Sequence, residues 1–177
     1  VAVIDADAQQ SLTNWLEARK KYYREESTGI DSYPFDVRKL DEDLKQIKRK
    51  YHFIIIDSPP SITYDTIQII KSSDKVFVPV QPSPLDLMAT VPFLNLVKQE
   101  RKKTTVILNR VMPRAKLTEA MIMRLRYAGA KIARSRISGK IIYAETFSVG
   151  RGVVDISVTS EASKEIIKVG NEILRNF

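Results

Sequence analysis

Residues 1–16 read VAVIDADAQQSLTNWL, and residues 51–60 read YHFIIIDSPP. In both stretches a short run of aliphatic residues ends in an aspartate, Asp5 in the first and Asp57 in the second. Runs of this length and composition are typical of strands buried on both faces of a parallel sheet. Because open α/β sheets bind ligands at the carboxyl ends of their strands, both aspartates are predicted to lie at a functional edge.

Strand-like and helix-like segments take turns along the rest of the chain. Apolar runs predict strands over residues 1–4, 53–56, 76–80 and 104–108, and a short strand around 35–37. Helical spacing predicts helices over about 11–23, 41–50, 64–72, 85–103, 117–128 and 160–177, with Trp15 as a core anchor of the first. This order predicts an α/β fold, a doubly wound and mostly parallel sheet with helices on both faces, and residues 1–177 are expected to form a single domain.

Composition excludes several classes of protein. The chain has no cysteine, which removes disulfide frameworks, Cys-ligated zinc, iron–sulfur clusters and thiol catalysis. Its one histidine, His52, lies just before Asp57 on the same predicted strand, so no Ser-His-Asp triad can be assembled. The longest nearly apolar stretch, residues 88–97, is about half as long as a membrane-spanning helix, and no membrane association is expected.

The positive charge is concentrated in one region, which we call the basic segment, residues 98–140. It holds 13 basic and two acidic residues, whereas the other 134 residues hold 16 basic and 19 acidic ones. The net charge of +8 therefore arises in this segment, which favours an anionic partner such as nucleic acid. A solvated basic surface without a partner remains the alternative.

Asp57 follows four apolar residues and precedes Ser58-Pro59-Pro60. A carboxylate in that position can hold Mg²⁺ directly or through water, because magnesium keeps several of its waters. A helix-capping aspartate is the alternative interpretation of Asp57 alone, and the matching strand end at Asp5 favours the metal.

Several segments together resemble the ParA/MinD family of partition ATPases. Residues 3–15 resemble its first switch segment, usually D-x-D-P-Q-x-S-x-T-x-W, and residues 51–60 resemble its Walker B strand and second switch. Residues 81–87 (QPSPLDL) are similar to the small ParA-like branch, and residues 137–155 are similar to the family's C-terminal block. Asn109 follows a predicted strand, as the family's adenine-contacting asparagine does. The resemblance covers the whole chain and implies a P-loop NTPase-like fold.

The resemblance implies a site and an activity. Asp7 is expected to orient the water that attacks the γ-phosphate of ATP, Asp57 to hold Mg²⁺, Asp5 to support the same region, and Asn109, with Arg110 beside it, to contact the nucleotide. The implied protein is a cytoplasmic, nucleoid-associated ATPase that dimerises with ATP, binds DNA without sequence preference, and segregates plasmid or chromosomal DNA with a ParB-like partner. The DNA-binding candidates in the basic segment are Arg110, Arg134, Arg136 and Lys140.

Two departures from the family pattern affect these expectations. Ala8 replaces the usual proline and Gln10 a small residue. The family also carries a Gly-rich phosphate loop before the first switch, and this chain contains no G-K-[ST] sequence. We therefore expect the domain to be N-terminally incomplete, without the first strand and phosphate loop, and the 177-residue chain alone to be inactive towards ATP. The alternative is a nucleotide-independent DNA-binding or scaffold protein descended from such an ATPase.

Overall fold

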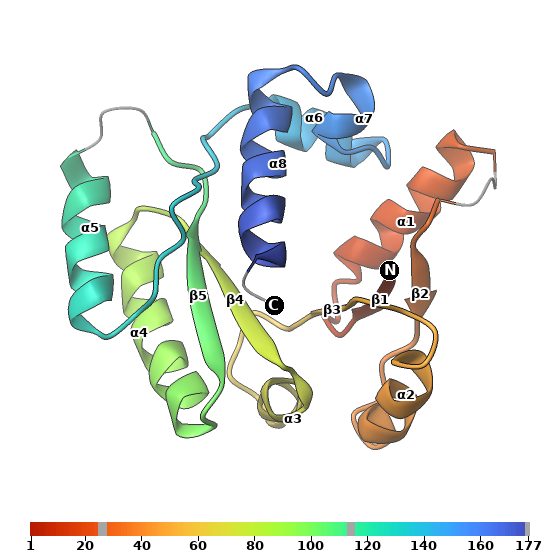
Figure 1. The fold of residues 1–177 in the computed structure, drawn as a ribbon, viewed down its shortest axis with the longest axis horizontal. Coiled ribbons are helices and arrows are strands. Elements are labelled where there is room, and N and C mark those ends of the chain that lie inside the picture. Colours follow the sequence, from red (N-terminus) through yellow and green to blue (C-terminus); the bar gives the residue numbers. More distant parts are fainter. Residues whose placement is uncertain (25–27, 113–115, 176–177) are drawn as a thin grey trace. The chain divides into compact units, whose positions relative to one another are not determined.

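A computed structural model describes residues 1–24, 28–112 and 116–175. The chain divides into two compact units. Unit 1 comprises residues 1–73 and 146–151, and unit 2 comprises residues 74–145 and 152–177. Each unit contains one parallel sheet with its own helices, so the α/β fold class is confirmed (Figure 1).

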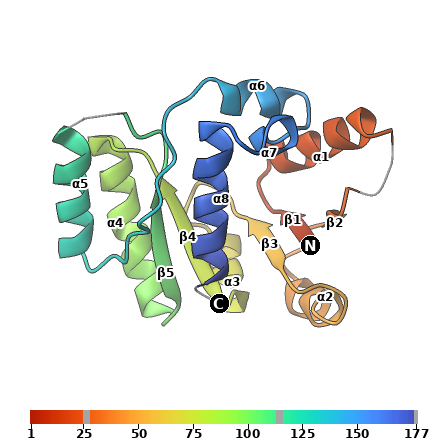
Figure 2. The ribbon, with the colours of Figure 1, turned by 45° about the horizontal axis from the view of Figure 1, so that its top comes forward.

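The sheet of unit 1 has the order β2-β1-β3, with β1 (Ala2–Asp5) between β2 (Asp31–Tyr33) and β3 (Ile54–Asp57) (Figure 2). All pairs are parallel, and Asp5 is the register partner of Asp57. Alternation along the strands sends Ala2 and Ile4 into one core cluster. That cluster also contains Leu40, Leu44 and Ile47 of α2 (Leu40–Ile47) and Ile69 of α3 (Tyr64–Ser72).

Helix α1 (Ser11–Tyr22) starts a few residues beyond the carboxyl end of β1. Its N-cap, Gln10, has a φ of 52° and makes no side-chain capping bond. This left-handed conformation favours glycine, which gives the replacement of a small residue by Gln10 a structural meaning.

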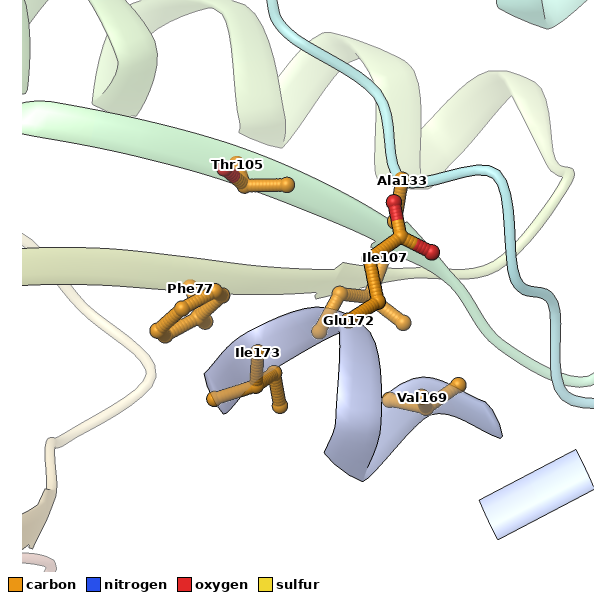
Figure 3. Close-up of a pocket in the computed structure, with 7 residues that line it drawn as sticks. All are labelled: Phe77, Thr105, Ile107, Ala133, Val169, Glu172 and Ile173. Atoms are coloured by element: carbon orange, nitrogen blue, oxygen red, sulfur yellow. The ribbon is translucent and has the colours of Figure 1, made fainter. Parts of the chain in front are cut away.

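Unit 2 is built on β4 (Lys75–Val80) and β5 (Lys103–Leu108), which pair in parallel. One face packs against α4 (Pro84–Gln99) and α5 (Lys116–Tyr127) through a cluster that includes Val80, Val106 and Leu108. The other face packs against α8 (Glu161–Leu174), where Phe77 and Ile107 meet Val169 and Ile173 (Figure 3). Helices therefore cover both faces of this sheet, as the sequence predicts.

An irregular segment, residues 131–139, runs parallel to the outer edge of β5. Val106 donates to the carbonyl of Lys131, and Ile137 donates to the carbonyl of Leu108, at 2.8 and 2.9 Å. The chain then forms α6 (Ile142–Ser148) and α7 (Val153–Ile156). No pattern in the sequence predicted the irregular segment, α6 or α7.

Other differences from the prediction have local causes. The short strand lies at residues 31–33 rather than around 35–37, and α4 ends at Gln99 because Lys103 already pairs in β5. Ile55 is 56% exposed, so β3 is not buried on both faces. Trp15 is half-buried and stacks on Phe147 instead of entering a core cluster of the described residues. Within the described residues, no helix is both long and apolar enough to cross a membrane.

Candidate functional site

Three carboxylates gather at the carboxyl edge of the sheet in unit 1. Asp5 and Asp57 end adjacent strands in register, and Asp7 follows in the turn that leads to α1. The N–H of Ala6 donates to the carbonyl of Asp57 at 2.8 Å, which ties this turn to β3. The predicted meeting of strand ends therefore brings Asp5, Asp7 and Asp57 together.

Both oxygens of Asp5 are bound by the chain itself. Its Oδ1 accepts the N–H of Asp7 at 3.2 Å, and its Oδ2 accepts the N–H and the hydroxyl of Thr13, each at 2.9 Å. Asp5 therefore anchors the Asp7 turn to the first turn of α1. This arrangement fits a supporting role for Asp5 better than direct contact with a ligand.

Asp57 and Asp7 keep oxygen atoms open. Asp7 Oδ1 accepts the N–H of Gln9 at 2.9 Å, while its Oδ2 and both oxygens of Asp57 make no hydrogen bond to the described residues. Partial burial of Asp57, with the negative charges of Asp5 and Asp7, raises the pKa of its carboxyl. A cation would relieve this repulsion, so the oxygen donors fit one Mg²⁺ that retains most of its waters. The described residues offer no closed set of three or more metal ligands.

Asn109 and Arg110 follow β5 in unit 2. The N–H of Asn109 donates to the carbonyl of Val80, and its side-chain oxygen accepts the N–H of Arg110, both at 2.9 Å. Arg110 is exposed and has a φ of 52°. This bent exit from the strand fixes Asn109 at the carboxyl end of β5, the position that the resemblance assigns to the adenine contact.

Lys140 is part of a polar network centred on Glu165 of α8. The Lys140 ammonium pairs with Glu165, and Ser138 and Tyr143 donate to the same carboxylate at 2.8 Å. Burial opposes ionisation, but these donors outweigh it and lower the pKa of Glu165 to about 2. Much of the charge of Lys140 is therefore neutralised within the protein.

Arg134 and Arg136 project from the irregular segment beside β5. Ala133 is buried and Ile137 packs against α8, whereas the two arginines between them are exposed. Glu172 of α8 accepts the backbone N–H groups of Arg134 and Ser135, each at 2.8 Å, and Figure 3 draws Glu172 beside Ala133. Arg136 pairs with Glu119 at 3.2 Å, while the Arg134 guanidinium has no ion pair among the described residues. The backbone of this segment is thus fixed while its arginines reach solvent.

The candidate residues therefore form separate groups. Asp5, Asp7 and Asp57 belong to unit 1, and Asn109, Arg110, Arg134, Arg136 and Lys140 belong to unit 2. Thr13, the threonine of the quoted switch pattern, had no role predicted from the sequence, and neither had Glu165 and Glu172, yet these residues hold the candidates in place. The alternation of buried and exposed positions over residues 133–137 could have revealed the irregular segment. The contacts of this segment with Glu165 and Glu172 could not be predicted, because these residues lie far along the chain and leave no local pattern.

The chain is similar in sequence to several known proteins. A family model described as "AAA domain" matches residues 25–110. The chain is 26% identical over 181 residues to "Maintenance of carboxysome distribution protein A" of Halothiobacillus neapolitanus, covering 98% of this chain and 82% of that protein. It is 26% identical over 146 residues to "Sporulation initiation inhibitor protein Soj" of Bacillus subtilis, covering 78% of this chain and 58% of that protein.

Solved structures share the fold. A variant of McdA of Cyanothece, solved as a complex with ATP, superposes with a TM-score of 0.78 at 17% identity, covering 97% of this chain and 84% of that one. The cell division ATPase MinD of Pyrococcus furiosus superposes with a TM-score of 0.74 at 19% identity, covering 99% and 86%. The matching family model, the sequence relatives and the shared fold together support a ParA/MinD-type partition ATPase family for this chain.

Proposed function

We propose that the full-length protein is an ATP-driven positioning protein that hydrolyses ATP with Mg²⁺ and binds DNA non-specifically as an ATP-dependent dimer. Its cargo would be a plasmid, a chromosome or, as the name of the Halothiobacillus neapolitanus relative suggests, a carboxysome. A ParB-like partner would connect the dimer to a DNA cargo, and the protein would act on the nucleoid in the cytoplasm. The observation that carries the proposal is the group of Asp5, Asp7 and Asp57 at one sheet edge.

Each candidate residue has a separate task in the proposed reaction. Asp7, with a free oxygen in a turn held by Asp5, would orient the attacking water, and Asn109 would contact the adenine edge. Asp57 would hold Mg²⁺ through its water shell, and the bound ion would neutralise charge on the phosphates. Phosphoryl transfer depends mainly on positioning and charge neutralisation, so the reaction needs no covalent nucleophile from the protein.

DNA binding is proposed to reside in the basic segment, chiefly at Arg134 and Arg136. Glu172 fixes the backbone N–H groups of Arg134 and of Ser135, which precedes Arg136. An exposed pair such as Arg136–Glu119 is weak enough to open when a phosphate competes. Arg110 is exposed and can contribute, whereas the ion pair with Glu165 makes Lys140 the weakest of the four candidates.

The experiment compares Mg²⁺-dependent ATP turnover by the full-length protein and its Asp7→Ala variant, with Glu17→Ala on α1 as the control. Asp7→Ala should bind ATP and lose turnover by about 100-fold or more, while the control keeps it. If Asp7→Ala hydrolyses ATP at the parent rate, the assignment of Asp7 is wrong. If the parent neither binds nor hydrolyses ATP, the scaffold alternative replaces the enzyme. The 177-residue chain alone is expected to show no turnover.

A further inference from the structure

Helix α1 is attached to the carboxylate edge at its first turn but only weakly to the core. Thr13 provides two of the bonds that hold Asp5. Of the twelve residues of α1, Leu16 alone is fully buried. Some other contact must therefore keep α1 in the position that Asp5 and the Asp7 turn require.

Residues 146–151, which we call the clamp segment, supply that contact within unit 1. Trp15 stacks on Phe147 with ring centroids 6.4 Å apart, and its Nε1 donates to the carbonyl of Arg151 at 3.4 Å. Arg19 Nη1 donates to the carbonyl of Gly150 at 3.2 Å, and the Arg19 guanidinium lies 5.2 Å from the centre of the Trp15 ring. Stacking, hydrogen bonding and cation–π attraction thus act along one face of α1.

Gly150 allows the backbone of the clamp segment to approach the backbone of α1 closely. It is buried and has a φ of +70°, and a Cβ on it would lie 2.1 Å from the backbone nitrogen of Arg19. That distance is far below van der Waals contact, and the atom it meets is helix backbone, which cannot rotate away. Any other residue at this position must push α1 and the clamp segment apart.

We propose that the clamp segment is a positioning element for the carboxylate edge, acting through α1 and Thr13. With the clamp closed, Thr13 holds Asp5, and Asp5 holds the N–H of Asp7. With the clamp opened, α1 can shift, the Thr13–Asp5 bonds weaken, and Asp7 loses its fixed direction. The catalytic consequence rests on the proposed function of Asp7, whereas the structural link does not.

The test compares Gly150→Ala with Gly29→Ala in the full-length protein without nucleotide. Gly29 has the same φ of +70° but nothing within 4 Å of a Cβ, so the control carries the backbone strain without the collision. Hydrogen exchange should speed up at the Thr13 amide by about tenfold or more in Gly150→Ala, while the Val106 amide in unit 2 exchanges as in the parent. The emission of Trp15, the one tryptophan of the chain, should change in the same variant.

Equal exchange at Thr13 in the parent and in Gly150→Ala would overturn the proposal. If Gly150→Ala does not fold, Arg19→Gln replaces it, because this variant removes the bond to Gly150 and the cation–π contact without a collision. For ATP turnover, the proposal predicts a lower kcat with an unchanged KM, and an unchanged kcat despite faster Thr13 exchange would also overturn it. If the parent protein shows no turnover, the proposed function is contradicted. Hydrogen exchange at the Thr13 amide then still tests whether the clamp segment positions the carboxylate edge.

Discussion

At the scale of single residues, the neighbours of a carboxylate decide whether it serves structure or chemistry. Asp5 and Glu165 have their oxygens filled by donors from the chain, so their charge holds segments of the protein together. Asp57 has no donor among the described residues and lies beside two other negative charges. A group kept in an unfavourable state by its surroundings is typical of a binding site.

This contrast predicts that Asp57→Asn stabilises the protein while it impairs function. Because the folded state raises the pKa of Asp57, its ionised form at neutral pH favours unfolding, and a neutral amide removes that penalty. The melting temperature without Mg²⁺ should therefore rise, and Mg²⁺-dependent ATP turnover of the full-length protein should be lost.

Asp36→Asn is the matched control for Asp57→Asn, since hydrogen bonds from Arg38 lower the pKa of Asp36. It should leave the melting temperature equal or slightly lower and keep turnover. A melting temperature that falls in Asp57→Asn would show that repulsion does not dominate at this edge.

Glu165 gives the opposite pH behaviour. Its pKa of about 2 lies below the ordinary value of 4.5, so its contribution to stability is complete above about pH 4.5 and is lost as the pH falls towards 2. Glu165→Gln should lower the free energy of unfolding by on the order of 2 kcal/mol at neutral pH, and by less at about pH 3. Urea unfolding at both pH values measures this, with exposed Glu161→Gln as the control. A deficit that stays constant with pH would contradict the network.

At the scale of elements, the sequence predicts those strands that a local run of apolar residues specifies. Continuous apolar runs predicted β1, β3, β4 and β5, and these strand ends correctly brought Asp5 and Asp57 together. The segment at residues 131–139 was missed because arginine, lysine and serine do not favour strands, and its bonds to β5 and α8 come from distant parts of the chain. For the same reason, the pairing of Lys140 with Glu165 could not be predicted.

The segment at residues 131–139 also contains Arg134 and Arg136, on which the prediction of DNA binding rests. With ATP, Arg134→Ala/Arg136→Ala in the full-length protein should bind two unrelated duplexes more weakly by similar factors, because phosphate contacts do not read sequence. The plot of log affinity against log salt should become less steep by about two per protomer, because about two phosphate contacts are lost. Lys39→Ala/Lys45→Ala, which removes equal charge from unit 1, should leave both unchanged. If the Arg134→Ala/Arg136→Ala variant has the DNA affinity and the salt slope of the parent, the DNA-binding surface lies elsewhere.

At the scale of the whole molecule, the division into units separates the candidate site into two groups. Asp7 and Asp57 lie in unit 1, and Asn109 lies in unit 2. The resemblance to the family could be recognised from the sequence because several individually weak motifs occur in the right order along the entire chain. That the chain forms one domain stays a prediction, and so does the position of Asn109 relative to the carboxylate edge.

The most direct test of the account is the sedimentation of the full-length Asp7→Ala variant with Mg²⁺ and ATP, with ADP, and without nucleotide. Because this variant is expected to bind ATP without consuming it, a two-fold dimer should accumulate with ATP and dissociate with ADP. The 177-residue chain should remain a monomer in all three conditions. A full-length protein that sediments as the same species with ATP, with ADP and without nucleotide would contradict the central claim that this protein is an ATP-switched partition ATPase.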